Sequence, residues 1–141
     1  MKMSKIKSLQ RLLVVQSIYQ LSINKDAIDF PVQNIFDQII ENSEYEKSIS
    51  KSNLNFAKKI FLGVKDNSDE INRDLSSALS NKNKIKSIDP LLLAIFHPAI
   101  YELKYGPKIS KKVVISEYLI IADKFFSSKE IGLLNGVLDN I

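Results

Sequence analysis

The sequence predicts an all-α protein, a single-domain bundle of about seven helices over residues 1–141. Apolar residues recur at intervals of three and four through most of the chain, which is the spacing of one helix face. No segment shows the alternation of apolar and polar residues that a half-buried strand requires. The length suits one domain, because a chain of 141 residues buries roughly two thirds of its unfolded surface on folding.

Capping residues and helix breakers set the expected boundaries in the N-terminal half. Proline fits the first turn of a helix, and Ser, Asn or Asp side chains cap a helix start. The polar stretches 24–29 and 41–51 are expected to be a turn and a loop. Four helices are expected in this half. The first spans residues 4–23 and the second begins at Pro31. The third runs from a cap at Ser52 or Asn53 to a break near Lys65 and Asp66, and the fourth carries Ile71, Leu75 and Leu79.

Three further helices are expected in the C-terminal half, after a basic loop at 80–88. Asp89 and Pro90 predict a helix start. This helix is apolar almost all round to about Tyr105, which is typical of a central helix. The last two helices are expected to begin after Ser110 and at the capping-box pair Ser127 and Glu130.

Asn135 and Gly136 form the dipeptide most typical of tight hairpin turns. Their neighbours, however, keep helical spacing rather than the alternation of two strands. We therefore place Gly136 inside the last helix, where we expect its missing side chain to let another helix backbone pass close.

The positive charge of the chain is gathered at one end. Of the net charge of +4, the first 25 residues supply the whole excess, because they hold five basic residues and no acid. The rest of the chain carries 15 basic and 16 acidic side chains. This asymmetry favours a polyanionic partner, and a merely solubilising N-terminus is the alternative. Tyr19 follows on the same helix, where it either stacks on a base or packs in the core.

No enzyme chemistry is expected, and no cofactor or metal. His97 is the only histidine and there is no cysteine, so a metal site is poorly supplied with ligands. Glu102 and Glu117 lie in apolar sequence and are interpreted as structural groups. No run approaches the 18 or so apolar residues that span a bilayer, and no signal peptide is expected, which fits a cytoplasmic protein.

Several blocks of the chain, in order, resemble the NusB family of transcription antitermination factors. They are VVQSIYQ at 14–20, FAKKIFLGV at 56–64, SIDPLLLAIFHPAIYELKYG at 87–106, KKVVISEYLIIADKF at 111–125 and LLNGVLDNI at 133–141. The resemblance implies binding of boxA-type single-stranded RNA from ribosomal RNA leaders. It also implies action with NusE, a small-subunit ribosomal protein, in a complex on RNA polymerase that suppresses termination; a homodimer is possible, as in some family members.

The resemblance also implies where RNA is contacted: the basic N-terminal segment and the loop before the final helix. The implied RNA-binding residues are Lys2, Lys5, Lys7, Arg11, Tyr19, Lys129 and Leu133. The sequence departs from the family pattern in using lysines where arginines are common, and in having Gly132-Leu133 where the family has Lys-Phe. A protein–protein adaptor that has lost RNA affinity is therefore an alternative. An accessory domain of a ribosomal RNA cytosine methyltransferase is less favoured, because no Gly-rich cofactor loop is present.

Overall fold

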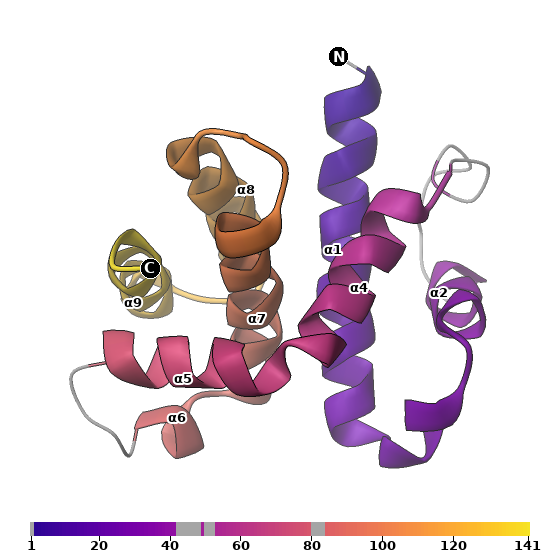
Figure 1. Cartoon of the computed structure of the whole chain (residues 1–141), viewed down its shortest axis with the longest axis horizontal. Helices are drawn as coiled ribbons and strands as arrows, with labels where there is room; N and C mark the ends of the chain where they lie inside the picture. Colours follow the sequence, from indigo (N-terminus) through magenta and orange to yellow (C-terminus); the bar gives the residue numbers. More distant parts are fainter. Residues whose placement is uncertain (1, 42–48, 50–52, 80–83) are drawn as a thin grey trace. The chain divides into compact units, whose positions relative to one another are not determined.

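The computed structural model describes residues 2–41, 49, 53–79 and 84–141, except for the side chains of residues 2–4 and 84. Within these residues all regular secondary structure is helical, which confirms the all-α fold class (Figure 1). The elements are α1 (Lys2–Ile23), the 3₁₀ helix η1 (Lys25–Asp29), α2 (Val32–Glu41), α4 (Asn55–Asp66), α5 (Ser68–Ala78), α6 (Lys84–Ser87), α7 (Pro90–Tyr105), α8 (Lys111–Asp123) and α9 (Ser128–Asp139).

Two short elements differ from the expected loops. The segment 24–29, expected as a polar turn, forms η1, in which the backbone N–H of Phe30 donates to the carbonyl of Ala27 at 3.0 Å. Ala27 is buried, so one small apolar residue is enough to fold this stretch onto its surroundings. The single turn α6 lies in the expected loop 80–88, while the expected loop 41–51 falls mostly outside the described residues.

The chain divides into two compact units, residues 1–62 and 63–141, and the boundary falls inside α4. In the first unit α1 contacts η1 and α2. The rings of Phe36 on α2 and Phe61 on α4 meet edge to face, with centroids 5.8 Å apart. Each unit has buried apolar side chains of its own, and the single domain expected from chain length stays a prediction.

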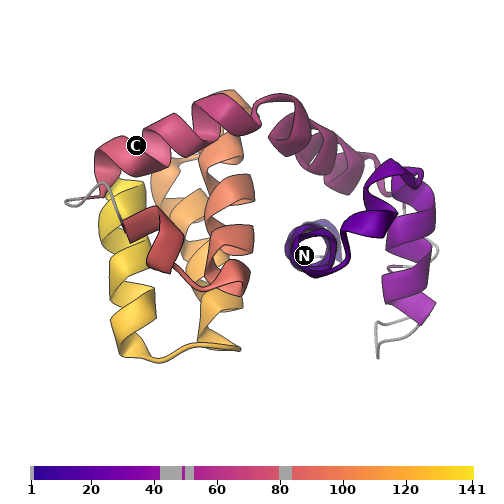
Figure 2. The same ribbon diagram turned by 90° about the horizontal axis from the view of Figure 1, so that it is seen from below.

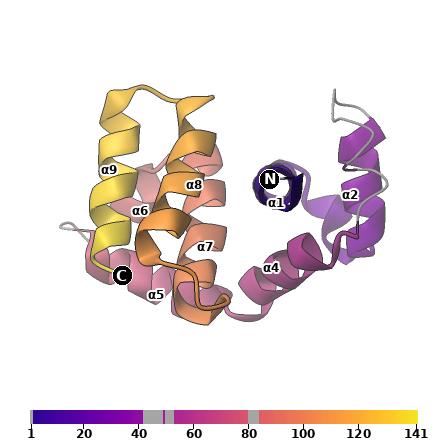
Figure 3. The same ribbon diagram turned by 90° about the horizontal axis from the view of Figure 1, so that it is seen from above.

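The second unit is built around α7, as its apolar sequence predicts. Helices α7, α8 and α9 run side by side, and α5 crosses one end of this group (Figures 2 and 3). The carboxylate of Asp89 caps α7, because its Oδ1 accepts from the backbone N–H of Leu91 at 2.8 Å. The residues that α7 buries are Leu92, Ala94, Ile95, Phe96, Pro98, Ala99, Ile100, Tyr101 and Glu102.

The glycines reverse one expectation. Gly136 lies within α9 as expected, but no atom of the described residues would lie within 4 Å of a Cβ there, so the predicted close approach of another backbone is wrong for the part of the chain that the structure describes. Close approaches occur at two other glycines. A Cβ on Gly63 would lie 2.2 Å from the ring of Tyr101, and one on Gly106 would lie 2.5 Å from the carbonyl oxygen of Glu102.

Candidate nucleic-acid interface

Helix α1 carries the positive charge that the sequence analysis singles out. It contains no carboxylate along its 22 residues, and Lys5 is exposed while Lys7 is half-buried. Lys2 begins the helix, but its side chain lies outside the described part of the structure. The first half of α4, which contacts α1, also lacks acidic residues until Asp66. Helix α1 and the part of α4 in the first unit therefore carry basic side chains and no acidic ones, and the two helices contact each other there.

Two cations of α1 share one aromatic ring. The Nζ of Lys7 lies 5.3 Å from the ring centroid of Phe56, and the guanidinium carbon of Arg11 lies 5.0 Å from it. Like charges four residues apart on a helix repel by about 0.2–0.5 kcal/mol. A cation over an aromatic face gains about 0.5–1 kcal/mol even at an exposed site, so the ring outweighs the repulsion between these two side chains.

A buried glutamine joins α1 to the start of α4. The Nε2 of Gln10 donates to the carbonyl of Asn53 at 3.0 Å, and its Oε1 accepts from the backbone N–H of Ala57 at 2.9 Å. Gln10 is only 2% exposed, and its hydrogen bond from Ala57 is buried, while the one to Asn53 is partly buried. The second bond satisfies one of the backbone donors that a helix start leaves unpaired. We call this pair of hydrogen bonds the Gln10 clamp.

Asn53 also confirms one expected cap of α4. Its Oδ1 accepts from the backbone N–H of Asn55 at 2.8 Å. The alternative cap, Ser52, lies outside the described residues. Asn53 thus serves both the start of α4 through its side chain and the Gln10 clamp through its carbonyl.

Arg11 lies in a different place from the one expected. The sequence predicts that it lies among the surface cations, but its side chain is only 3% exposed. Its guanidinium packs on the ring of Phe56, and this contact offsets part of the cost of burying a charge. Among the described side chains of α1, Lys5 and Lys7 are the cations that reach the surface, and the buried position of Arg11 changes the role that we propose for it.

Tyr19 lies farther along α1. Eight residues separate it from Arg11, which is roughly 12 Å along a helix axis. Its side chain is half-buried, which is compatible with either packing or a stacking contact at its exposed part. Its carbonyl accepts a hydrogen bond from the hydroxyl of Ser22 at 2.6 Å.

The two residues implied at the last helix lie in the second unit. The exposed Lys129 and the half-buried Leu133 line a pocket of about 510 Å³ together with Ile88, Leu92 and other residues at the starts of α7 and α9. The capping box predicted at this helix is present: the backbone N–H of Ser127 donates to Glu130 Oε1 at 3.1 Å. Hydrogen bonding from Ser127 lowers the pKa of Glu130, so its carboxylate is ionised beside Lys129.

Sequence reasoning missed two residues of the first unit. The apolar spacing of residues 54–64 predicts a core position for Phe56, yet its side chain is half-buried and two cations lie over its ring. Lys59 is exposed and follows Phe56 by three residues, so the two are neighbours on the surface of α4. The sequence signal for both is the pair of lysines inside FAKKIF, which follows an aromatic residue at helical spacing.

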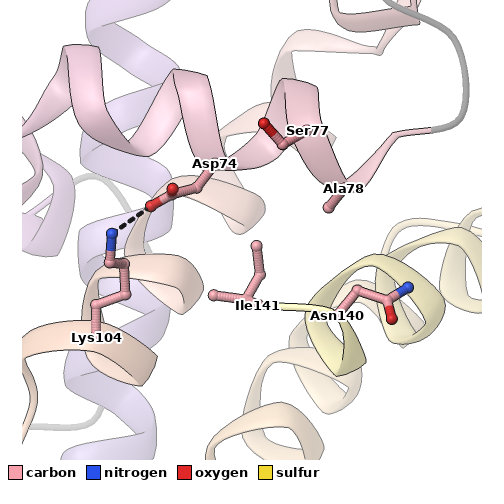
Figure 4. A pocket seen from close by; sticks show the side chains of 6 residues that line it. All are labelled: Asp74, Ser77, Ala78, Lys104, Asn140 and Ile141. Carbon is pink, nitrogen blue, oxygen red and sulfur yellow. Dashed lines mark hydrogen bonds and ion pairs between the residues drawn. The ribbon is translucent and has the colours of Figure 1, made fainter.

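Other titratable groups of the described residues are held in structural contacts. Lys104 Nζ lies 3.1 Å from Glu70 and 2.5 Å from Asp74, at the edge of a cavity of about 400 Å³ (Figure 4). Two carboxylates thus neutralise the single cation of that cavity. Among the described residues no group of three or more His, Asp or Glu side chains is placed to hold a metal ion. Within the same residues every helix is too short or too polar to cross a lipid bilayer.

The fold and this arrangement define a class of protein: a small all-α protein whose distinguishing feature is a cationic helix face. The chain belongs to the NusB family, whose model matches residues 8–141. The transcription antitermination protein NusB of Clostridium botulinum is 32% identical over 135 residues, covering 96% of both chains. The protein of the same name from Rickettsia bellii is 34% identical over 141 residues, covering 96% of this chain and 88% of the relative.

Solved structures agree on the fold. NusB of T. maritima superposes with a TM-score of 0.74 at 22% identity, covering 94% of this chain and 87% of that one. The crystal structure of the antitermination factors NusB and NusE in complex with dsRNA gives a TM-score of 0.71 at 16% identity, covering 99% and 96%.

Proposed function

We propose that the protein is a transcription antitermination factor that binds boxA-type single-stranded RNA. It acts together with a NusE-type small-subunit ribosomal protein on RNA polymerase, and it does so in the bacterial cytoplasm. The observation that carries this proposal is family membership over residues 8–141, with relatives of nearly equal length that are antitermination proteins. The NusB–NusE–RNA complex of the same fold supports both classes of partner.

The RNA-binding face of this proposal is the basic side of the first unit. Lys5 and Lys59 are exposed there and Lys7 is half-buried, whereas Lys129 is an exposed cation of the second unit. Lysines act as point charges and do not form the bidentate contacts of arginine. We therefore expect affinity to be strongly salt-dependent, with base identity read by stacking and edge contacts to unpaired bases.

The test measures RNA affinity against salt concentration for matched lysine variants. Each phosphate contact to a single strand contributes about 0.7 to the slope of log affinity against log salt. The double variant Lys5→Gln, Lys7→Gln should therefore lower that slope by roughly 1.4. The control is Lys108→Gln, Lys112→Gln, which removes the same charge from exposed positions in the second unit.

Three RNAs separate the remaining possibilities: a boxA-like strand, a scrambled strand and a duplex of the boxA-like sequence. Preferred binding to the first supports the proposal. Equal binding to all three shows that the protein binds RNA without the proposed specificity. If Lys5→Gln, Lys7→Gln binds with unchanged affinity and slope, α1 is not the RNA face.

A protein–protein adaptor is the second candidate, and one observation favours it. Gly132 and Leu133 stand where the family pattern has Lys-Phe. If Gly132 carried a Cβ, no atom of the described residues would lie within 4 Å of it. The last helix therefore offers neither the cation nor the ring of the family at that point. The measurement is binding of this chain to a NusE-type protein, with and without the boxA-like strand. An adaptor would bind the NusE-type protein equally in both cases and would show no affinity for the RNA.

A further inference from the structure

We infer that Phe56 is a positioning residue of the proposed RNA face: its ring, fixed by the Gln10 clamp, holds Lys7 and Arg11 together on one side of α1. This inference rests on the proposed function, because it assigns Phe56 a role in RNA binding. Phe56 itself need not touch the RNA. It acts through the two cations that lie over its ring.

The packing of Phe56 differs from that of its neighbours in the same unit. Phe36 is buried completely and Phe61 is 5% exposed, and their rings pack on each other. Phe56 is half-buried, and two cations of α1 lie over its ring. A ring placed only to fill the core would gain most by facing apolar side chains. Its position at a cationic helix face is explained by the charges that it holds.

The Gln10 clamp and the Phe56 ring lie next to each other and involve adjacent residues on both helices. Gln10 and Arg11 are consecutive on α1, and Ala57 and Phe56 are consecutive on α4. Gln10 bonds the backbone of Ala57, and Arg11 lies over Phe56, so the two pairs fix each other's register. Lys7 precedes Gln10 by three residues and therefore lies on the same side of α1. One turn of α1 thus carries both cations and the hydrogen bonds that locate the ring beneath them.

Holding these cations in advance lowers the cost of binding a phosphate strand. A lysine side chain loses conformational entropy when it is immobilised on a partner. A side chain that already packs on a ring has lost part of this entropy in the free protein, so binding costs less. Arg11, which is buried, contributes its charge at a fixed distance, while Lys7 reaches the surface. Without the ring the number of charges is the same but their arrangement is not.

This distinction gives a measurable signature. Phe56→Leu should weaken binding of the boxA-like strand roughly three- to tenfold, the range expected for one side chain that must be ordered on binding. Its salt slope should stay close to that of the wild type, because no charge is removed. Lys7→Gln should instead lower the slope by about 0.7. Phe56→Tyr keeps the ring and should bind within twofold of the wild type.

The matched control is Phe61→Leu, which removes a ring of the same unit that packs edge to face on Phe36. It should lower the unfolding temperature and leave RNA affinity unchanged at temperatures where the protein is folded. A readout without RNA is the NMR shift of the Lys7 ε-methylene protons. These protons should show an aromatic ring-current shift in the wild type and in Phe56→Tyr, and lose it in Phe56→Leu.

The outcomes separate the two proposals. If the wild type binds the RNA and Phe56→Leu binds equally well, or if Phe56→Tyr loses as much as Phe56→Leu, the role of Phe56 is refuted while the proposed function stands. If the wild type binds no RNA, the proposed function fails and the role of Phe56 in RNA binding fails with it.

Discussion

The hydroxyl of Tyr118 on α8 donates a hydrogen bond to the carboxylate of Glu102 on α7, inside the core of the second unit. Tyr118 is fully buried and Glu102 is only 4% exposed. A carboxylate at such a depth is costly unless hydrogen bonds stabilise it. This environment supports the interpretation of Glu102 as a structural group that ties α7 to α8.

Replacing Tyr118 by Phe removes this donor and keeps the ring. We expect the free energy of unfolding to fall by about 1–3 kcal/mol, because a buried acceptor loses one of its hydrogen bonds. Urea unfolding followed by circular dichroism measures this change. The double variant Tyr118→Phe, Glu102→Gln should recover part of the loss, since it no longer buries a carboxylate; an unchanged stability of the single variant would contradict the structural role of the pair.

Two glycines should respond to alanine in opposite directions. At Gly106, which follows α7, a Cβ would lie 2.5 Å from a backbone carbonyl, so Gly106→Ala should destabilise the protein by about 1–3 kcal/mol. At Gly136 the space is open and the residue is helical, so Gly136→Ala should stabilise it by about 0.5–1 kcal/mol. Both are measured by thermal and urea unfolding. A loss of stability in Gly136→Ala would mean that this face of α9 is covered by something in solution.

The helix ends could be predicted from sequence because caps are local. Asp89 and the pair Ser127 and Glu130 each act within three residues of chain, and the expected hydrogen bonds are present. What a residue meets from a distant helix could not be predicted in this way. The two hydrogen bonds of the Gln10 clamp join residues 43 and 47 positions apart, and the spacing of α1 alone does not reveal which neighbours will cover Arg11.

The surroundings of the glycines and of Phe56 could not be predicted for the same reason, because they depend on residues from distant parts of the chain. Gly63 lies against Tyr101, 38 positions along the chain, whereas no described residue approaches the Cβ position of Gly136, although both glycines lie in helices. Phe56 stands on an apolar pattern, and only the register of α4 against α1 brings it under Lys7. The charge asymmetry, by contrast, is a property of composition, and it correctly pointed to α1 as an acid-free helix.

Stability at low pH should depend on Glu70. A hydrogen bond from the hydroxyl of Tyr105, and next one from Lys104, lower the pKa of Glu70 below its ordinary value of 4.5. A carboxylate whose pKa is lower in the folded than in the unfolded chain stabilises the fold at pH values above its unfolded-state pKa. This stabilisation is lost as the pH falls through the folded-state pKa. We therefore expect Glu70→Gln to flatten the loss of stability below about pH 4.5 in urea unfolding. Asp123→Asn, an exposed acid outside this network, should keep the wild-type profile.

His97 should make the protein less stable as the pH falls from neutral. Burial lowers the pKa of its imidazole below 6.5, and its Nε2 lies 3.1 Å from Oδ1 of Asn72, which suits a neutral ring that donates from Nε2. The unfolded chain takes up a proton near pH 6.5 while the folded chain does not. The free energy of unfolding therefore falls between pH 6.5 and the lower folded-state pKa, at no more than about 1.4 kcal/mol per pH unit.

Glutamine at position 97 tests this directly, because its amide also donates but does not titrate. We expect His97→Gln to remove the part of the pH dependence of stability that begins below about pH 6.5 and to leave the slope above pH 7 unchanged. The chain has one histidine, so its ring-proton resonance is unambiguous and its NMR titration gives the folded-state pKa. A midpoint at or above 6.5 would show that burial does not govern this ring, and an equal slope in both proteins would assign the pH dependence to other groups.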